Sequence, residues 1–214
     1  MGAKDKEVDW PSCQLMLVIE PGPGAREQLQ AALDAAPIAA VLLRPKQGDQ
    51  LGGGETKPLV DLAQAHGAAA ILFDDIDLAK TLRADGVHVP AGLDIPEQVA
   101  AARSVLGDDA TIGVDAGTSR HHAMEAGEAG AAYVAFGVID GTVDGRTQRD
   151  ALLEWWAEIF EIPSVALDLE SAEDVVLASS FGADFAGLSI RPGQSTDDVA
   201  ALVGAADMQL LQRT

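Results

Sequence analysis

The sequence predicts one α/β domain folded as a single (β/α)8 TIM barrel. The first observation is an alternation of short apolar runs with longer helix-like stretches, which recurs about eight times and is typical of parallel strands joined by helices. The second is the length of 214 residues, which suits one domain near the lower end of the barrel size range. An open doubly wound sheet would fit the same alternation, but closure is favoured because a closed sheet has no exposed edge.

The first four strand–helix units are expected in the N-terminal half of the chain. Gly67 comes shortly before the third strand, as in turns that end a helix with a left-handed residue. Pro96 stands in the first turn of the fourth helix, where its missing N–H has no helical partner. The strands are expected at residues 15–19, 39–43, 69–73 and 86–89, and the helices at 26–36, at a stretch ending near His66, at 76–83 and at 95–106.

The other four units follow the same pattern. Ser171 is expected to cap the seventh helix, with Glu173 near the capping-box position. These units place the barrel at residues 14–204, between an N-terminal extension at 1–13 and a C-terminal tail at 205–214. The strands are expected at 111–114, 132–136, 164–167 and 185–188, and the helices at 119–129, at 151–161, after Ser171 and from near Ser195.

Composition and charge narrow the classes of partner. The formal charge is −20, with 34 acidic and 14 basic residues, which disfavours a general nucleic-acid or anionic-membrane surface because both attract clustered lysine and arginine. A strongly anionic small substrate would therefore need local cations or a metal. Cys13 is the single cysteine, so an intrachain disulfide is impossible. The charged N-terminal segment lacks the apolar core of a signal peptide, so we expect a cytoplasmic protein. A homo-oligomer is possible, because the sequence does not determine the oligomeric state.

Two cations follow the second predicted strand. In a barrel of this kind the functional residues lie on the loops after the strands, at their carboxyl ends. Arg44 and Lys46 stand there on either side of Pro45, and such a pair offers the charge and hydrogen bonds that a phosphate requires. Taken alone, the pair also fits an ordinary solvated strand end.

Carboxylates follow the third and fourth predicted strands. Asp74 and Asp75 come directly after Phe73, and Asp94 stands just before the fourth helix. Oxygen ligands of this kind suit Mg²⁺, so Asp74 and Asp94 are candidate metal ligands. The alternative is that these aspartates cap the helices that follow them, because an acidic side chain satisfies the free N–H groups of a first turn.

These strand-end motifs belong to a longer series with a defined order and spacing. The series is Arg44-Pro45-Lys46, Ile71 to Ala79, Ala84 to Val89 with Asp94 nearby, Ile112-Gly113-Val114, and Gly130 to Ile139 with Thr142 following. In order and spacing it resembles thiamine phosphate synthase, and the likeness covers roughly strands two to six. The related thiazole tautomerases share the same scaffold.

The resemblance implies an Mg²⁺-dependent transferase of thiamine biosynthesis. Such an enzyme joins a pyrimidine pyrophosphate to a thiazole phosphate and releases pyrophosphate, so the partners would be phosphorylated small molecules. By similarity, Arg44 and Lys46 would contact the pyrophosphate, and Asp74 and Asp94 would hold the metal. The expected mechanism is dissociative: the C–O bond breaks first, and the thiazole nitrogen captures the pyrimidine carbocation. Thr142 and Arg146, the latter as a substitute for a lysine, are further candidates for phosphate binding. Arg191 stands in the loop after the eighth strand, where it could belong to an anion site at the N-terminus of the last helix or to a plain loop and cap.

Several positions depart from the family pattern. The added carboxylates act against binding of anionic substrates, because like charges repel. A second hypothesis is therefore a noncatalytic paralogue that uses the barrel to bind a ligand or a partner. The departures are Phe73 in place of asparagine, Asp115 in place of serine, Gly145 in place of lysine, and Asp168 with Glu170 in place of a Gly-Gly phosphate loop.

Overall fold

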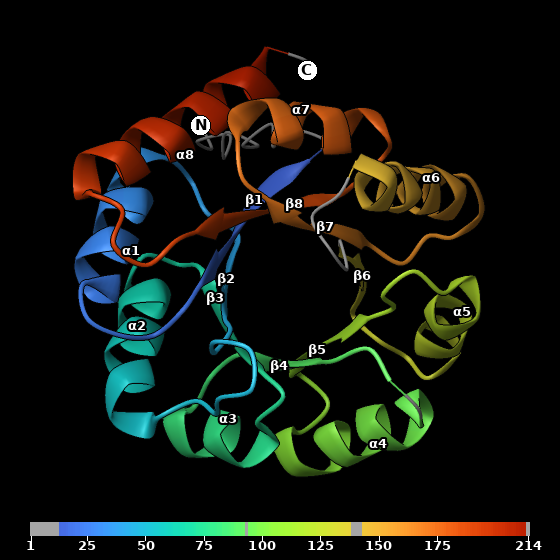
Figure 1. Cartoon of the computed structure of the whole chain (residues 1–214). Coiled ribbons are helices and arrows are strands. Elements are labelled where there is room, and N and C mark those ends of the chain that lie inside the picture. The colour runs from blue at the N-terminus through green and yellow to red at the C-terminus, as the bar shows by residue number, and fades with distance from the viewer. Residues whose placement is uncertain (1–12, 93, 138–142, 213–214) are drawn as a thin grey trace, which may run out of the picture.

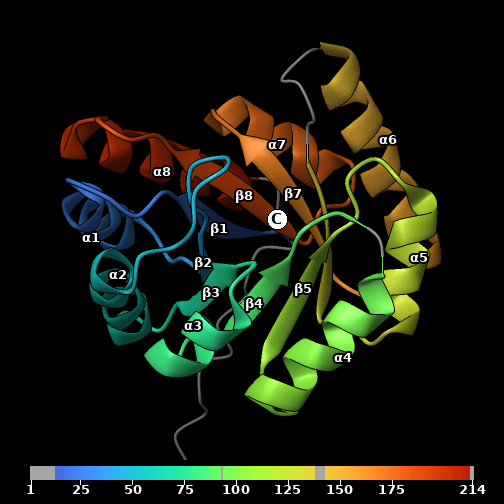
Figure 2. The same cartoon turned by 60° about the horizontal axis from the view of Figure 1, so that its bottom comes forward.

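A computed structural model describes residues 13–92, 94–137 and 143–212 and contains a closed parallel barrel. The strands follow one another around the ring in sequence order, and β1 pairs with β8 to close it. Figure 1 is a view down the axis of the barrel and shows the helices arranged outside the ring of strands. The tilted view of Figure 2 shows the same inner layer of strands and outer layer of helices. The predicted TIM-barrel fold is confirmed.

The eight strands and eight helices of the described residues lie close to their predicted positions. The strands are β1 Gln14–Ile19, β2 Ala40–Leu43, β3 Ala69–Phe73, β4 Gly86–Val89, β5 Thr111–Asp115, β6 Tyr133–Phe136, β7 Ser164–Leu169 and β8 Phe185–Ile190. The helices are α1 Ala25–Ala35, α2 Gly53–Ala65, α3 Ile76–Leu82, α4 Ile95–Leu106, α5 Arg120–Glu128, α6 Val143–Ile159, α7 Ala172–Ser180 and α8 Thr196–Leu211.

The core has two layers because each strand is buried on both faces. Successive side chains of a strand point to opposite faces of a sheet. In β1, Leu15 and Leu17 therefore pack with the helices in the larger apolar cluster, while Met16 and Val18 belong to a smaller cluster inside the barrel. This double burial explains why the strands read as continuous apolar runs in the sequence.

Tyr133 crosses the interior of the barrel over a glycine. A Cβ atom at Gly113 in β5 would lie 1.9 Å from the ring of Tyr133, so a side chain at position 113 would displace the tyrosine. The small residue on one strand thus makes room for the large residue on the next strand, as close packing of an interior requires.

Two helices extend beyond their predicted bounds. Helix α6 starts at Val143 rather than near Ala151, because its first two turns are mostly polar and lack the apolar spacing on which the prediction depended. Helix α8 continues past residue 204 to Leu211, and Ala206 and Leu210 are buried against the barrel. Among the described residues, no helix is both long enough and apolar enough to span a bilayer.

Candidate active site

A hollow of about 620 Å³ lies at the carboxyl ends of the strands, where barrel proteins place their active sites. It brings together residues at or just after the carboxyl ends of β1, β2, β3, β7 and β8. Its charged members mix cations with carboxylates, so the hollow can receive a polar ligand through both donors and acceptors. These members are Glu20, Arg44, Lys46, Asp49, Asp168, Glu170 and Arg191.

Arg44 is bound to a carboxylate across the hollow. Its Nη2 atom donates to Oδ1 of Asp168 at 2.8 Å, and each side chain is about a third exposed. An ion pair with this exposure is weak in water, because solvent screens it. Arg44 can therefore exchange Asp168 for another anion at modest cost.

A bulge in β7 directs Asp168 to the mouth of the barrel. The pairing with β8 shifts register between Ala166 and Leu169, and Asp168 has a left-handed φ of 59°. Leu167 packs inside the barrel and Leu169 packs outside it, so the bulge moves Asp168 out of the strand alternation that would otherwise turn it toward the helices. The carboxylate thereby reaches Arg44.

Lys46 lies in the same hollow as Arg44. It is exposed, and within the described part of the chain it forms no ion pair. Its ammonium group is consequently available to an anionic ligand without the loss of an internal partner.

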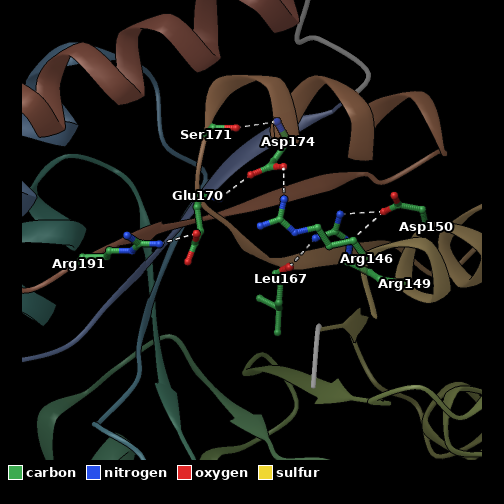
Figure 3. A network of polar contacts seen from close by, with 8 residues as sticks. All are labelled: Arg146, Arg149, Asp150, Leu167, Glu170, Ser171, Asp174 and Arg191. Carbon is green, nitrogen blue, oxygen red and sulfur yellow. Dashed lines mark hydrogen bonds and ion pairs between the residues drawn. The ribbon is translucent and has the colours of Figure 1, made fainter. Parts of the chain in front are cut away.

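A second hollow, of about 340 Å³, adjoins the first and shares Glu170, Ser189 and Arg191 with it. Figure 3 shows the polar network of this region. Arg191 pairs with Glu170, and this contact raises the pKa of the Arg191 guanidinium. Nη1 of Arg146 lies 3.7 Å from Oδ1 of Asp174. Arg146 thus stands on helix α6 rather than in the loop expected for it, and its cation also faces a carboxylate.

The predicted metal ligands differ in their surroundings. The backbone N–H of Asp74 donates to the carbonyl of His88 at 3.0 Å, which fixes Asp74 beside the end of β4. Burial, and then the charge of Asp75, raises the pKa of the Asp74 carboxyl. Asp75, not Asp74, caps α3 by accepting a hydrogen bond from the N–H of Leu78 at 2.9 Å. The helix-cap alternative is therefore correct for Asp75. Within the described ranges the Asp74 carboxylate accepts no hydrogen bond and forms no ion pair.

Asp94 occupies the N-cap position of α4, yet its side chain makes no capping hydrogen bond. Asp74 and Asp94 both have left-handed backbone angles and so stand at sharp turns after their strands. Within the described ranges, no group of three or more candidate His, Cys, Asp or Glu ligands comes together. Mg²⁺ is commonly held by one or two protein carboxylates together with substrate phosphates, so the chemistry of either aspartate suits it without a third protein ligand.

A stack of three rings lies beside the hollow. His88 is stacked between Phe73 and Tyr133, with centroid distances of 5.7 Å on both sides. Nδ1 of His88 and the hydroxyl of Tyr133 are 2.9 Å apart, whereas Nε2 of His88 has no hydrogen-bond partner among the described residues. Burial, and secondarily the positive charge of Arg44, lowers the pKa of His88 to about 3, so the imidazole is neutral.

Neither His88 nor Tyr133 was predicted to have a role, although both are polar residues inside apolar strands. A polar side chain in a strand buried on both faces is the signal that could have singled them out. Burial, and then the charge of Asp115, raises the pKa of the Tyr133 hydroxyl, so it remains protonated and can donate a hydrogen bond.

Asp115 is the last residue of β5 and is half-buried. Burial raises its pKa above the ordinary aspartate value, while a 2.7 Å hydrogen bond from the N–H of Gly117 acts in the opposite direction. The raised pKa means that the site disfavours the charged form of this carboxyl. Thr142, which the resemblance implied in phosphate binding, lies outside the described residues.

The fold and this mouth define a β/α-barrel protein whose strand ends carry cations and carboxylates suited to small charged ligands. The chain belongs to the thiamine monophosphate synthase family, whose model matches residues 15–189. The family resemblance seen in the motifs is thereby confirmed.

Individual relatives match over most of the chain. It is 39% identical over 208 residues to the thiamine-phosphate synthase of Rhodospirillum centenum, covering 94% of this chain and 98% of the relative. It is 40% identical over 174 residues to the thiamine-phosphate synthase of Erythrobacter litoralis, covering 78% and 80%. A solved thiamine phosphate pyrophosphorylase from Pyrococcus furiosus has a TM-score of 0.75 with 21% identity over 94% of this chain and 97% of that one, a likeness that shows the fold.

Proposed function

We propose that this protein is a thiamine-phosphate synthase that joins a pyrimidine pyrophosphate to a thiazole phosphate and releases pyrophosphate. The observation that carries the proposal is the similarity to thiamine-phosphate synthases over nearly the whole chain. Arg44 and Lys46 in one hollow, with Asp74 at the end of the neighbouring strand, support it because they are the groups a departing pyrophosphate would need.

Lys46 and Arg44 are proposed to bind the pyrophosphate. Lys46 would engage it directly, and Arg44 would exchange its bond to Asp168 for one to the leaving group. The C–O bond then breaks with both electrons staying on pyrophosphate, and the thiazole nitrogen forms the new C–N bond with the pyrimidine carbocation. The two cations lower the energy of the charge that gathers on the leaving oxygens, and the step requires no general base.

Asp74 and Asp94 are proposed to hold Mg²⁺. When bound, the ion would supply positive charge to the pyrophosphate oxygens. Burial, and secondarily the charge of Asp75, raises the pKa of Asp74, and a cation beside this carboxylate would stabilise its ionised form. The family has an asparagine where this chain has Phe73. The phenylalanine ring stacks on His88 and has no amide group with which to bond a ligand.

A noncatalytic ligand-binding role is the second candidate, and one observation favours it. Arg44, Arg146 and Arg191 each face a carboxylate of this same chain. A barrel that had lost its substrates could retain such internal pairs, because they hold the mouth together without a ligand.

The test is a direct assay with the pyrimidine pyrophosphate, the thiazole phosphate and Mg²⁺, which measures thiamine phosphate and released pyrophosphate. We expect turnover, and we expect Asp74→Asn to lower kcat/KM on the order of 100-fold because the metal loses a charged ligand. Asp77→Asn, on the exposed side of α3, is the matched control and should retain the wild-type rate. No turnover, together with no thermal shift from either substrate, would favour the ligand-binding role instead.

A further inference from the structure

The loops after β7 and β8 carry an unusual arrangement of charges. Barrel proteins frequently bind phosphate at this place, with the help of backbone N–H groups at a helix N-terminus. In this chain the 340 Å³ hollow at that place contains two arginines, Arg146 and Arg191, and each already has a carboxylate partner. The partners, Asp174 and Glu170, lie four residues apart at the start of α7.

Asp174 is the third residue of α7, and its carboxylate turns back toward the segment that leads into this helix. One carboxylate oxygen accepts a hydrogen bond from the N–H of Glu170 at 3.2 Å, and the other faces Arg146. The N–H of Asp174 is itself occupied, because it donates to Oγ of Ser171 at 3.1 Å. Figure 3 shows this carboxylate between the backbone of residue 170 and the Arg146 guanidinium. The chain thus satisfies with its own carboxylate the donors that a phosphate would use.

Arg191 is held in a similar way. Its guanidinium pairs with Glu170, and its backbone N–H donates to the side-chain oxygen of Gln194 at 2.7 Å. Gln28 on α1 donates to the carbonyls of Arg191 and Gln194 at 3.0 and 2.9 Å. These hydrogen bonds fix the backbone of the loop after β8. The position from which the Arg191 side chain reaches Glu170 is therefore fixed as well.

The end of β7 is fixed as well. Arg149 on α6 is 1% exposed, and its Nη1 donates to the carbonyl of Leu167 at 3.3 Å. The same guanidinium pairs with Asp150 at 2.8 Å. The buried Arg149 guanidinium thus fixes the carboxyl end of β7, and Glu170 directly follows this strand. The Glu170 carboxylate therefore extends from a stable part of the barrel.

We propose that Glu170 and Asp174 are internal counter-anions that occupy the phosphate position beside Arg146 and Arg191 and must be displaced when a phosphate-bearing substrate binds. They are specificity-determining residues: they weaken binding of phosphate groups at this hollow and so raise the KM of the phosphorylated thiazole. The inference rests on the proposed function for the identity of that substrate. The physical reason is competition, since a guanidinium paired with a carboxylate has part of its charge compensated, and the carboxylate repels the incoming dianion.

The test compares the wild-type protein with the double variant Glu170→Gln/Asp174→Asn. Both substitutions keep an oxygen acceptor and remove the charge, so the local hydrogen bonds can persist. The matched control is Glu173→Gln/Asp197→Asn, which removes two exposed charges from the first turns of α7 and α8; within the described part of the chain neither of these residues pairs with an arginine. Circular dichroism and melting temperature establish that all three proteins are folded.

Two readouts are measured on each protein. Calorimetric titration with inorganic phosphate should show affinity at least about tenfold higher in the double variant than in wild type, a gain of about 1.4 kcal/mol by the thermodynamic conversion. In the assay, the KM for thiazole phosphate should fall by a similar factor, and the KM for the pyrimidine pyrophosphate should fall by less, since Lys46 and the pair of Arg44 with Asp168 are untouched. The control variant should change neither value by more than about twofold.

Unchanged or weaker phosphate affinity in the folded double variant would overturn the proposal, because it would mean that the carboxylates orient the arginines rather than compete for them. An equal gain in the control variant would also overturn it, since the effect would then come from net charge alone. The phosphate titration needs no turnover. An inactive protein whose double variant gains phosphate affinity would therefore reject the proposed function and leave this inference standing.

Discussion

At the scale of the residue, two cations at the mouth of the barrel differ in whether they already have an anionic partner. Arg44 is already paired with Asp168, whereas Lys46 is exposed beside it without an ion pair in the described part of the chain. Binding of an anion by Arg44 therefore includes the loss of an existing contact, and binding by Lys46 does not. We therefore expect Lys46 to contribute more than Arg44 to the proposed binding of pyrophosphate.

We expect Lys46→Ala to raise the KM for the pyrimidine pyrophosphate by about 10- to 100-fold, because a charge-assisted hydrogen bond contributes roughly 1.5–3 kcal/mol. Steady-state kinetics with each substrate varied in turn measures the effect. Lys57→Ala on α2, where the lysine pairs with Asp61, serves as the control and should behave as wild type. Equal KM values for the two variants would show that Lys46 takes no part in binding.

The neutral imidazole of His88 predicts a specific loss of stability in acid. Its pKa in the folded protein is lowered to about 3 from a usual value of 6.5, so between these limits the unfolded chain binds a proton that the folded protein does not. Stability contributed by the neutral imidazole is complete above pH 6.5 and decreases as the pH falls toward about 3. The expected slope is at most about 1.4 kcal/mol per pH unit.

Urea denaturation of wild type and His88→Gln at several acidic pH values measures this slope. The variant lacks the titrating ring but can still bond to Tyr133, so its unfolding free energy should depend less steeply on pH. An NMR titration of the His88 ring gives an independent reading. A midpoint near 6.5 in the folded protein would contradict the prediction.

At the scale of the element, β7 is where this barrel departs from regular geometry. Its bulge turns Asp168 to the mouth, and the strand end is tied to α6 by Arg149. Arg149 and Asp150 are adjacent in sequence and both buried, so each compensates the charge of the other. The pair therefore couples the helix before β7 to the carboxyl end of that strand.

We expect Arg149→Met to lower the free energy of unfolding by about 3–5 kcal/mol, because it leaves the carboxylate of Asp150 buried without its partner. The double variant Arg149→Met/Asp150→Leu should recover part of this loss, since both buried charges are then removed. Chemical denaturation of the three proteins measures the difference. A single variant as stable as wild type would mean that the pair contributes nothing to holding α6 against β7.

At the scale of the whole molecule, the charge of −20 must act against compactness, because like charges on a folded chain repel. The protein counters this locally: acidic side chains stand in the first turns of several helices, where the helix dipole stabilises them, as Glu173 and Asp174 do in α7. The remaining repulsion is exposed to solvent and therefore sensitive to ionic strength.

We expect the melting temperature to rise by about 2–4 °C between low-salt buffer and about 0.15 M NaCl, which corresponds to roughly 1 kcal/mol for a domain of this size. Differential scanning calorimetry with a chelator present measures the shift without divalent cations. KCl at the same ionic strength should have the same effect if screening is the cause. A fall in melting temperature with added salt would show that favourable ion pairs outweigh the repulsion.

The sequence by itself determined the barrel and its family. Alternating apolar runs fix the number and order of strands, because each run must be buried on both faces of a parallel sheet. The strand bounds followed for the same reason, with β3 and β4 matching their predicted ranges. Bounds failed where this signal is weak, as at the start of α6, whose first turns are polar.

Only the tertiary structure decided which charges meet. Arg44 and Asp168 are 124 positions apart, and no local pattern predicts their contact, which depends on a bulge and on closure of the ring. The same is true of His88 and Tyr133, which pair across the interior over a glycine. Periodicity is a local property of the chain, whereas electrostatic partners are set by distances in space. The cations at the mouth of the barrel could therefore be predicted from the sequence. Only the folded barrel could show that Arg44, Arg146 and Arg191 are already paired with carboxylates.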